Sequence, residues 1–142
     1  MLLKDKVAVI TGASRGIGKA IAEKFAENGA KVALISRSDG AIKLAQQLSD
    51  QGFTARGYQL DVSDYQQTQQ VAQQILQDFE TVDILVNNAG ITRDTLLLRM
   101  SEEDWDKVIL VNLKSVFNLT KAFLFRQWYV SVAEFLSISV QL

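Results

Sequence analysis

The segment TGASRGIG at residues 11–18 constrains the fold of this chain more than any other feature. It places Gly12, Gly16 and Gly18 directly after the apolar run VAVI, where a buried strand would pass into a helix. Glycine permits a tight turn and a close approach of the backbone to a ligand, and free N–H groups at the start of a helix bind phosphate. The segment therefore predicts a βαβ unit that binds the diphosphate of a dinucleotide, rather than a glycine turn needed only for close packing.

Short apolar runs without polar alternation recur at residues 7–10, 32–35 and 84–86. Such runs are typical of strands that are buried on both faces of a parallel sheet. A further strand is expected at residues 54–60, and the longer segments between the strands have helical spacing. Because strands and helices alternate, we expect an α/β fold, a Rossmann-type doubly wound parallel sheet that is truncated after about four strands and four helices.

Local signals predict where the helices begin and end. The Asn-Gly pair at residues 28–29 supplies the left-handed residue that ends the first helix, and the second helix is expected between Gly40 and Gly52. Ser63 and Ser101 are the expected N-caps of the third and fourth helices. The side chains expected to face the core are Ile17, Ile21, Ala22 and Phe25 in the first helix and Ile42, Ala45 and Leu48 in the second.

The composition excludes several classes of function. The 142 residues include neither Cys nor His, so we expect no zinc or other metal site, no disulfide and no thiol- or histidine-based catalysis. A net charge of -1 gives no field that would attract nucleic acid or an anionic membrane. The first residues lack a secretory pattern, and charges interrupt the apolar end of the chain, so we expect a cytoplasmic protein without a membrane anchor.

Four motifs, in this order, resemble the short-chain dehydrogenase/reductase family: TGASRGIG at residues 11–18, LDV at 60–62, NNAG at 87–90 and VNLKSVFNLTKA at 111–122. The segment GITRDTLLLRM at residues 90–100 resembles, more narrowly, the 3-oxoacyl-acyl-carrier-protein reductases of fatty-acid synthesis. The resemblance covers residues 3 to about 122. It implies hydride transfer between a nicotinamide dinucleotide and the ketone of an acyl-carrier-protein thioester, in a family whose members form homo-oligomers.

The resemblance also implies roles for individual residues. It assigns the pyrophosphate end of the cofactor to Gly12, Ser14, Arg15, Gly16, Ile17 and Gly18. It assigns adenine to Asp61 and Val62, and the ribose side to Asn88, Ala89 and Gly90. Asn87 is expected to brace the sheet. Asn112 is the one member of the family's catalytic set that can be placed, and an ordinary polar residue within a helix is its alternative interpretation.

The residues at the end of the second strand bear on the choice of dinucleotide. A site for NAD(H) uses a carboxylate there to bind the ribose 2′-OH, whereas a site for NADP(H) needs cations and no nearby acid. Here the strand ends in Ser36 and Arg37, and Arg15 lies in the glycine segment, which favours NADP(H) over NAD(H). The alternative is that both arginines are solvated surface charges, and Asp39 nearby keeps NAD(H) open.

The proton donor of the family's reaction is missing from these residues. The resemblance implies a tyrosine that protonates the alkoxide and a lysine four positions later that lowers the tyrosine pKa, together with a serine. The residues four positions after Tyr58, Tyr65 and Tyr129 are Val62, Gln69 and Ala133. We therefore expect this chain to be inactive alone, and either a non-catalytic dinucleotide-binding fragment or an unstable product.

The final segment departs from the family pattern. We expect residues 1–122 to form the dinucleotide-binding half and residues 123–142 to be an aberrant tail rather than a domain. A back-translation of residues 126–142, read from its third nucleotide, yields PMVRQRSGILINISSV, which resembles the family's continuation into a fifth strand. The hypothesis is a frameshift near residues 122–126. Because the family's oligomers form through helices that include the missing tyrosine helix, we do not carry the oligomer over to this chain. The β-prone run EFLSISV at residues 134–140 could still pair with the edge of the fourth strand, or aggregate.

Overall fold

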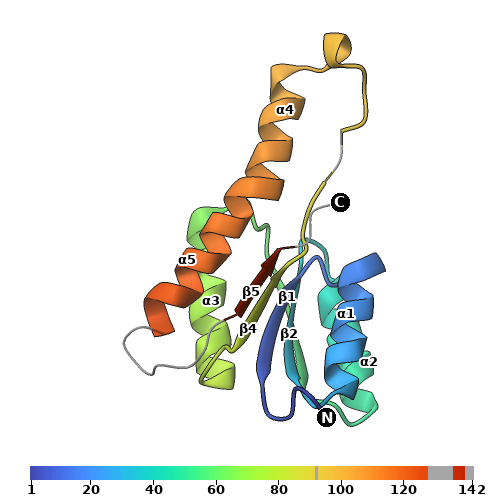
Figure 1. Cartoon of the computed structure of the whole chain (residues 1–142), viewed down its shortest axis with the longest axis vertical. Helices are drawn as coiled ribbons and strands as arrows, with labels where there is room; N and C mark the ends of the chain where they lie inside the picture. Colours follow the sequence, from blue (N-terminus) through green and yellow to red (C-terminus); the bar gives the residue numbers. More distant parts are fainter. Residues whose placement is uncertain (92, 128–135, 140–142) are drawn as a thin grey trace.

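The computed structural model describes residues 1–91, 93–127 and 136–139. Within them, parallel strands form one sheet in the order β3-β2-β1-β4-β5 (Figure 1). The strands are β1 (Val7–Thr11), β2 (Lys31–Ser36), β3 (Ala55–Gln59), β4 (Ile84–Asn87) and β5 (Leu136–Ser139). The chain runs outward from β1 to β3 and then crosses to β4 on the other side of β1. This topology confirms the Rossmann-type doubly wound class.

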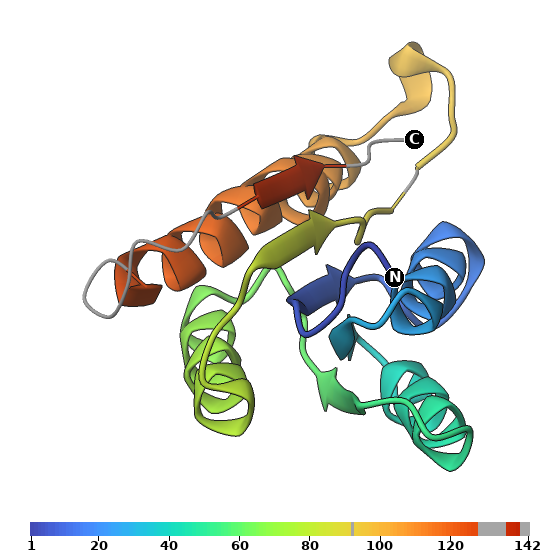
Figure 2. The ribbon, with the colours of Figure 1, turned by 60° about the horizontal axis from the view of Figure 1, so that its bottom comes forward.

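Helices cover both faces of the sheet, as Figure 2 shows. The helices α1 (Gly16–Glu27) and α2 (Gly40–Asp50) lie on one face, and α3 (Tyr65–Phe79) and α5 (Ser115–Gln127) lie on the other. The helix α4 (Glu102–Ile109) continues through a π-helical segment, Leu110–Lys114, into α5, so that these three pieces form one long rod that extends past the sheet (Figure 1). A short 3₁₀ turn, Leu97–Arg99, precedes α4.

The strands β1, β2 and β4 are mostly apolar because both of their faces are buried. Every residue of β1 and β4 is buried, and so is every residue of β2 after Lys31. Ala8 and Ile10 face α1 and α2, whereas Val7 and Val9 face α3 and α5. The strand periodicity of two therefore divides one apolar run between two separate cores, as expected for a sheet between two helical layers.

The expected inward faces of α1 and α2 are right in part. Ala22 is fully buried, but Ile17 is 40% exposed, because the buried stripe of α1 is Gly18, Ala22 and Ala26, one position away from it. In α2 the buried stripe is Ala41, Leu44, Ala45 and Leu48, which follows the i, i+3, i+4, i+7 spacing of one helix face. Ile42 is 45% exposed, since it is one position away from that stripe. The prediction that Ile17 and Ile42 face the core is therefore wrong.

The helix caps show why one boundary was misplaced. Ser101 caps α4 as expected, with its hydroxyl accepting from the N–H of Asp104 at 3.1 Å. Ser63 does not cap α3, because its hydroxyl donates instead to the carboxylate of Asp61 at 2.6 Å. The cap is the next residue, Asp64, whose carboxylate accepts from the N–H of Gln67. Aspartate and serine cap helices about equally well, so local contacts decided between the two.

The sheet has a fifth strand beyond the four that the sequence predicts. β5 lies in the segment expected to be an aberrant tail, and it pairs in parallel with β4 over Leu136–Ser139. The β-prone run at residues 134–140 was expected to be able to form this pairing with the edge of the fourth strand. Positions 123–127 of that segment belong to α5, whereas positions 128–135, which include Tyr129, and 140–142 lie outside the described residues. In the described part of the chain, no helix has the length and apolarity to cross a bilayer.

Phe123 provides a test of how far the core extends along α5. Its side chain is fully buried in the core between the sheet, α3 and α5, although it lies just past the predicted end of the dinucleotide-binding half. We expect Phe123→Ala to lower the free energy of unfolding by about 3–5 kcal/mol, because it leaves a cavity. Urea denaturation measures this change. Leu124→Ala, at a 40% exposed neighbour, is the control and should cost about 1 kcal/mol; equal effects would contradict the described packing.

Candidate functional site

A cavity of about 670 Å³ lies where the strand order reverses, beyond the carboxyl ends of β1 and β4. Ligands of doubly wound sheets bind at such a switch point. The predicted site residues that line the cavity are Arg15, Arg37, Asn88, Ala89, Gly90 and Asn112. The cavity is also lined by Asn87, Ile91, Arg93, Val108, Ile109, Leu113 and Val116. Segments that are far apart in the sequence therefore meet at one cavity.

Other predicted site residues lie outside the lining of this cavity. They are Gly12, Ser14, Gly16, Ile17, Gly18, Asp61 and Val62. Asp61 follows β3, is exposed, and its carboxylate accepts hydrogen bonds from the N–H and hydroxyl of Ser63. Val62 is buried, and its carbonyl accepts from the side-chain amide of Asn118 on α5. Contact of Asp61 and Val62 with adenine therefore stays a prediction.

The glycine turn brings the backbones of three segments together. Gly12 and Gly16 have left-handed φ values of 63° and 57°. A Cβ on Gly18 would lie 2.1 Å from the carbonyl oxygen of Gly12 and 2.6 Å from the amide nitrogen of Asn88, so only glycine fits there. Arg15 is the N-cap residue of α1 but makes no side-chain cap hydrogen bond. The turn thus combines a close backbone approach with first-turn N–H groups that no N-cap side chain satisfies, which fits a diphosphate.

Thr11 connects this turn to the segment that follows β4. Its hydroxyl accepts from the N–H of Asn88 at 3.0 Å and of Ala89 at 2.9 Å, and donates to the carbonyl of Val86 at 3.4 Å. The side-chain amide of Asn88 in turn donates to the carbonyl of Gly12 at 3.2 Å. Sequence reasoning did not single out Thr11. The available signal was a polar residue at the end of an apolar strand, directly before the first glycine.

Asn112 braces the loop that closes the cavity from the α4–α5 side. Its side-chain oxygen accepts from the N–H of Ile91 at 2.7 Å, and its amide nitrogen donates to the carbonyl of Ile91 at 2.9 Å. A Cβ on Gly90 would lie 3.2 Å from the same oxygen, so the loop passes close to the helix. Asn112 lies in the π-helical segment, and π-bulges are frequent at functional sites. Its position at the cavity is described, whereas its catalytic role stays a prediction.

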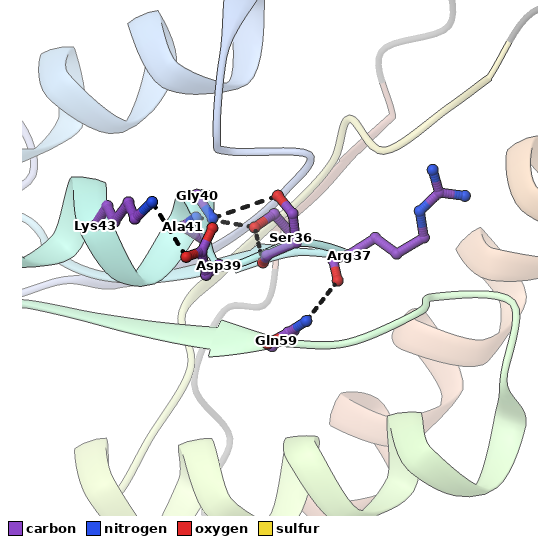
Figure 3. Close-up of polar contacts among 8 residues, drawn as sticks. Ser36, Arg37, Asp39, Gly40, Ala41, Lys43 and Gln59 are labelled. Atoms are coloured by element: carbon purple, nitrogen blue, oxygen red, sulfur yellow. Dashed lines mark hydrogen bonds and ion pairs between the residues drawn. The ribbon is translucent and has the colours of Figure 1, made fainter.

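The charge of the cavity wall is positive. Arg15 and Arg37 line it and form no ion pair with any residue that the structure describes, and neither Asp nor Glu is among the described lining residues. Arg93 also lines it and lies 3.7 Å from the carboxylate of Asp104. Asp39, three positions after the end of β2, pairs with Lys43 at 3.2 Å and lies on the opposite side of the turn from the Arg37 guanidinium (Figure 3). Such a wall favours an anionic ligand.

The described tyrosines lie outside the cavity lining. The hydroxyl of Tyr58 donates to Asp78 at 2.6 Å, and burial, with that hydrogen bond, raises the pKa of Tyr58 above its usual value of 10.0. This shift is opposite to the one that activates a phenol as a proton donor near neutral pH. Lys121 lies with its Nζ 5.8 Å from the ring centre of Tyr65, away from the cavity lining. Neither phenol is placed to protonate a ligand in the cavity.

Comparison with known proteins identifies the family. The family model for short chain dehydrogenases matches residues 6–129, which include the glycine turn, the segment after β4 and all of α5. The chain belongs to the short chain dehydrogenase family. The match extends a few residues beyond the resemblance seen in the sequence, which ends at about Ala122.

Individual members of the short chain dehydrogenase family match the same part of the chain. The chain is 51% identical over 125 residues to the 3-oxoacyl-[acyl-carrier-protein] reductase of Vibrio cholerae and 50% identical over 123 residues to that of Escherichia coli, which covers 87% and 86% of this chain. A crystal structure of a short chain dehydrogenase from Burkholderia cenocepacia in complex with NADP matches with a TM-score of 0.82 and 34% identity over 87% of this chain. The chain spans about half the length of each, namely 50%, 49% and 51%.

Thr11 gives a test of the connection between the glycine turn and the segment after β4. Thr11→Val keeps the shape of a 2% exposed side chain but leaves the N–H groups of Asn88 and Ala89 without their acceptor. We expect this change to lower the free energy of unfolding by about 2–4 kcal/mol, measured by urea denaturation. Thr11→Ser keeps the hydroxyl, and its expected cost is about 1 kcal/mol for the lost methyl group. A larger loss for serine than for valine would argue against the hydroxyl as the stabilising group.

Proposed function

We propose that this chain is the cofactor-binding half of an NADP(H)-dependent 3-oxoacyl-acyl-carrier-protein reductase of fatty-acid synthesis, and that its 142 residues bind NADP(H) without reducing a ketone. The observation that carries the proposal is the pair Arg15 and Arg37, which line one cavity with Asn88, Ala89 and Gly90 while no acid lines it among the described residues. The two reductases named above support the proposed reductase relationship, and the NADP-bound neighbour supports NADP(H) as the cofactor.

The chemistry that the proposed cofactor supplies when bound is hydride transfer between its nicotinamide and a ketone. The chain's own contribution is binding and orientation. The first-turn N–H groups of α1 receive the diphosphate, and Arg15 and Arg37 offer guanidinium groups to a ribose 2′-phosphate. Asn112 holds the loop at Gly90 and Ile91 against the helix and so shapes the opposite wall. Asp61 and Val62 are proposed to contact adenine.

The family's proton donor, a tyrosine with a lysine four positions later, has no match in this sequence. No tyrosine in the sequence is followed four positions later by lysine, and the described phenols lie away from the cavity lining. Loss of general acid catalysis typically reduces a rate by about 10²–10⁴-fold. The proposal therefore describes the 142 residues as a non-catalytic dinucleotide-binding fragment. The alternative is a product that is too unstable to bind any cofactor.

Titration with the two reduced coenzymes tests the cofactor proposal. We expect saturable, stoichiometric binding of NADPH, followed by the change in nicotinamide fluorescence, and weaker binding of NADH. Arg37→Gln should weaken NADPH binding by about tenfold and leave NADH within about twofold, because only NADPH carries the 2′-phosphate that the guanidinium would contact. Arg99→Gln changes an exposed arginine outside the cavity lining and is the control. Equal losses for both coenzymes would contradict a contact with the 2′-phosphate.

An activity assay tests the second part of the proposal. The purified 142-residue chain, mixed with NADPH and a 3-oxoacyl thioester, should oxidise NADPH no faster than buffer alone, because no positioned acid protonates the alkoxide. An intact 3-oxoacyl-acyl-carrier-protein reductase from Escherichia coli is the positive control. Turnover by the chain above the buffer rate would overturn the proposed inactivity, and binding of NADPH without turnover supports the fragment.

The proposal for the final segment is out-of-frame translation that begins near residues 122–126. Its support is that the shifted reading of residues 126–142 resembles a family strand and turn. The nucleotide sequence of the gene decides this point. A downstream frame that encodes a Tyr-x-x-x-Lys continuation is the expected result, and its absence would remove the hypothesis without affecting the coenzyme titration.

A further inference from the structure

The turn between β2 and α2 is held by a buried hydroxyl. The side chain of Ser36 is at the end of β2 and is only 6% exposed. Its hydroxyl donates to the carbonyl of Ser38 at 2.8 Å and accepts from the N–H of Ala41 at 2.9 Å (Figure 3). One side chain therefore ties the strand end both to the turn and to the first turn of α2. Arg37 is the residue between Ser36 and Ser38, and it is therefore part of the turn that this hydroxyl holds.

A second contact comes from the neighbouring strand. The side-chain amide of Gln59, at the end of β3, donates to the carbonyl of Arg37 at 3.0 Å. Figure 3 shows this carbonyl turned toward β3 while the guanidinium extends away from α2. Because ψ has few allowed ranges, an anchored carbonyl restricts the ψ of Arg37 and with it the direction in which the Cα–Cβ bond leaves the backbone. In this arrangement, Arg37 lines the cavity.

The same turn places an acid on the other side. The carboxylate of Asp39 pairs with Lys43 at 3.2 Å, and both side chains are on the α2 side of the turn in Figure 3. An exposed pair of this kind contributes little to stability, so it does not by itself fix the turn. The turn is instead held by the hydrogen bonds of the Ser36 hydroxyl and the Gln59 amide. Held in this way, the turn directs Arg37 toward the cavity and Asp39 toward α2.

We propose that Ser36 and Gln59 are positioning residues that make the site selective for a 2′-phosphorylated dinucleotide, by holding the β2–α2 turn with Arg37 toward the cavity. This inference rests on the proposed cofactor function and adds two residues that no motif singled out. Neither side chain lines the described cavity, so each acts through Arg37. A purely structural role would weaken the binding of both coenzymes together, whereas a positioning role weakens the phosphorylated one selectively.

The test compares NADPH and NADH dissociation constants for Ser36→Ala and Gln59→Leu by fluorescence titration of the full 142-residue chain. Each variant removes one anchor, and we expect NADPH binding to weaken by about fivefold, with NADH within about twofold. The matched control is Gln47→Leu, the same exchange at an exposed position of α2 outside the cavity lining, which should change neither constant. Circular dichroism of each variant checks that the fold is retained.

A double-variant cycle shows whether the anchors act through the guanidinium. Once Arg37→Gln has removed that group, adding Gln59→Leu should cause no further loss of NADPH affinity beyond about twofold. Additive losses, or equal losses for NADPH and NADH in the single variants, would overturn the positioning role while the proposed cofactor site stands. If the unaltered chain binds neither coenzyme, the proposed function fails and this inference fails with it.

Discussion

The site depends on one backbone contact at the switch point of the sheet. Gly18, in the first turn of α1, lies so close to the carbonyl of Gly12 that a Cβ at this position would be 2.1 Å from that oxygen. The side-chain amide of Asn88, in the segment after β4, donates a hydrogen bond to the same carbonyl of Gly12. Because three segments share this space, a side chain at Gly18 would separate β1, α1 and the β4 loop, and with them the two walls of the cavity.

The two walls contribute different physical properties. The wall formed by the glycine turn and the β2–α2 turn carries Arg15 and Arg37, so it is positive and suited to phosphate. The opposite wall is formed by the loop after β4 and by the long rod, and it includes Val108, Ile109 and Leu113. Asn112 joins loop and rod through its paired hydrogen bonds with Ile91. An anionic and partly apolar molecule matches this combination of walls.

Sequence patterns predicted most of the fold where the signal is local. The apolar runs marked the first, second and fourth strands, and the cap at Ser101 and the left-handed Gly29 marked two helix ends correctly. The errors arose where two equally good local signals competed, as for Ser63 and Asp64, or where helix rotation depends on packing, as for Ile17 and Ile42. β5 was not among the predicted strands, because its place depends on an edge that β4 supplies.

The sequence by itself determined the glycine turn, the alternation of buried strands and helices, and the family, since these depend on neighbours within a few positions. Only the tertiary structure decided which predicted residues share a cavity and which way Arg37 and Asp39 lie. The Thr11 hydroxyl and the N–H of Asn88 are 77 positions apart in the sequence, and Gln59 reaches Arg37 across 22. Such contacts follow from the strand order, which places distant strand ends side by side, and no local pattern contains that order.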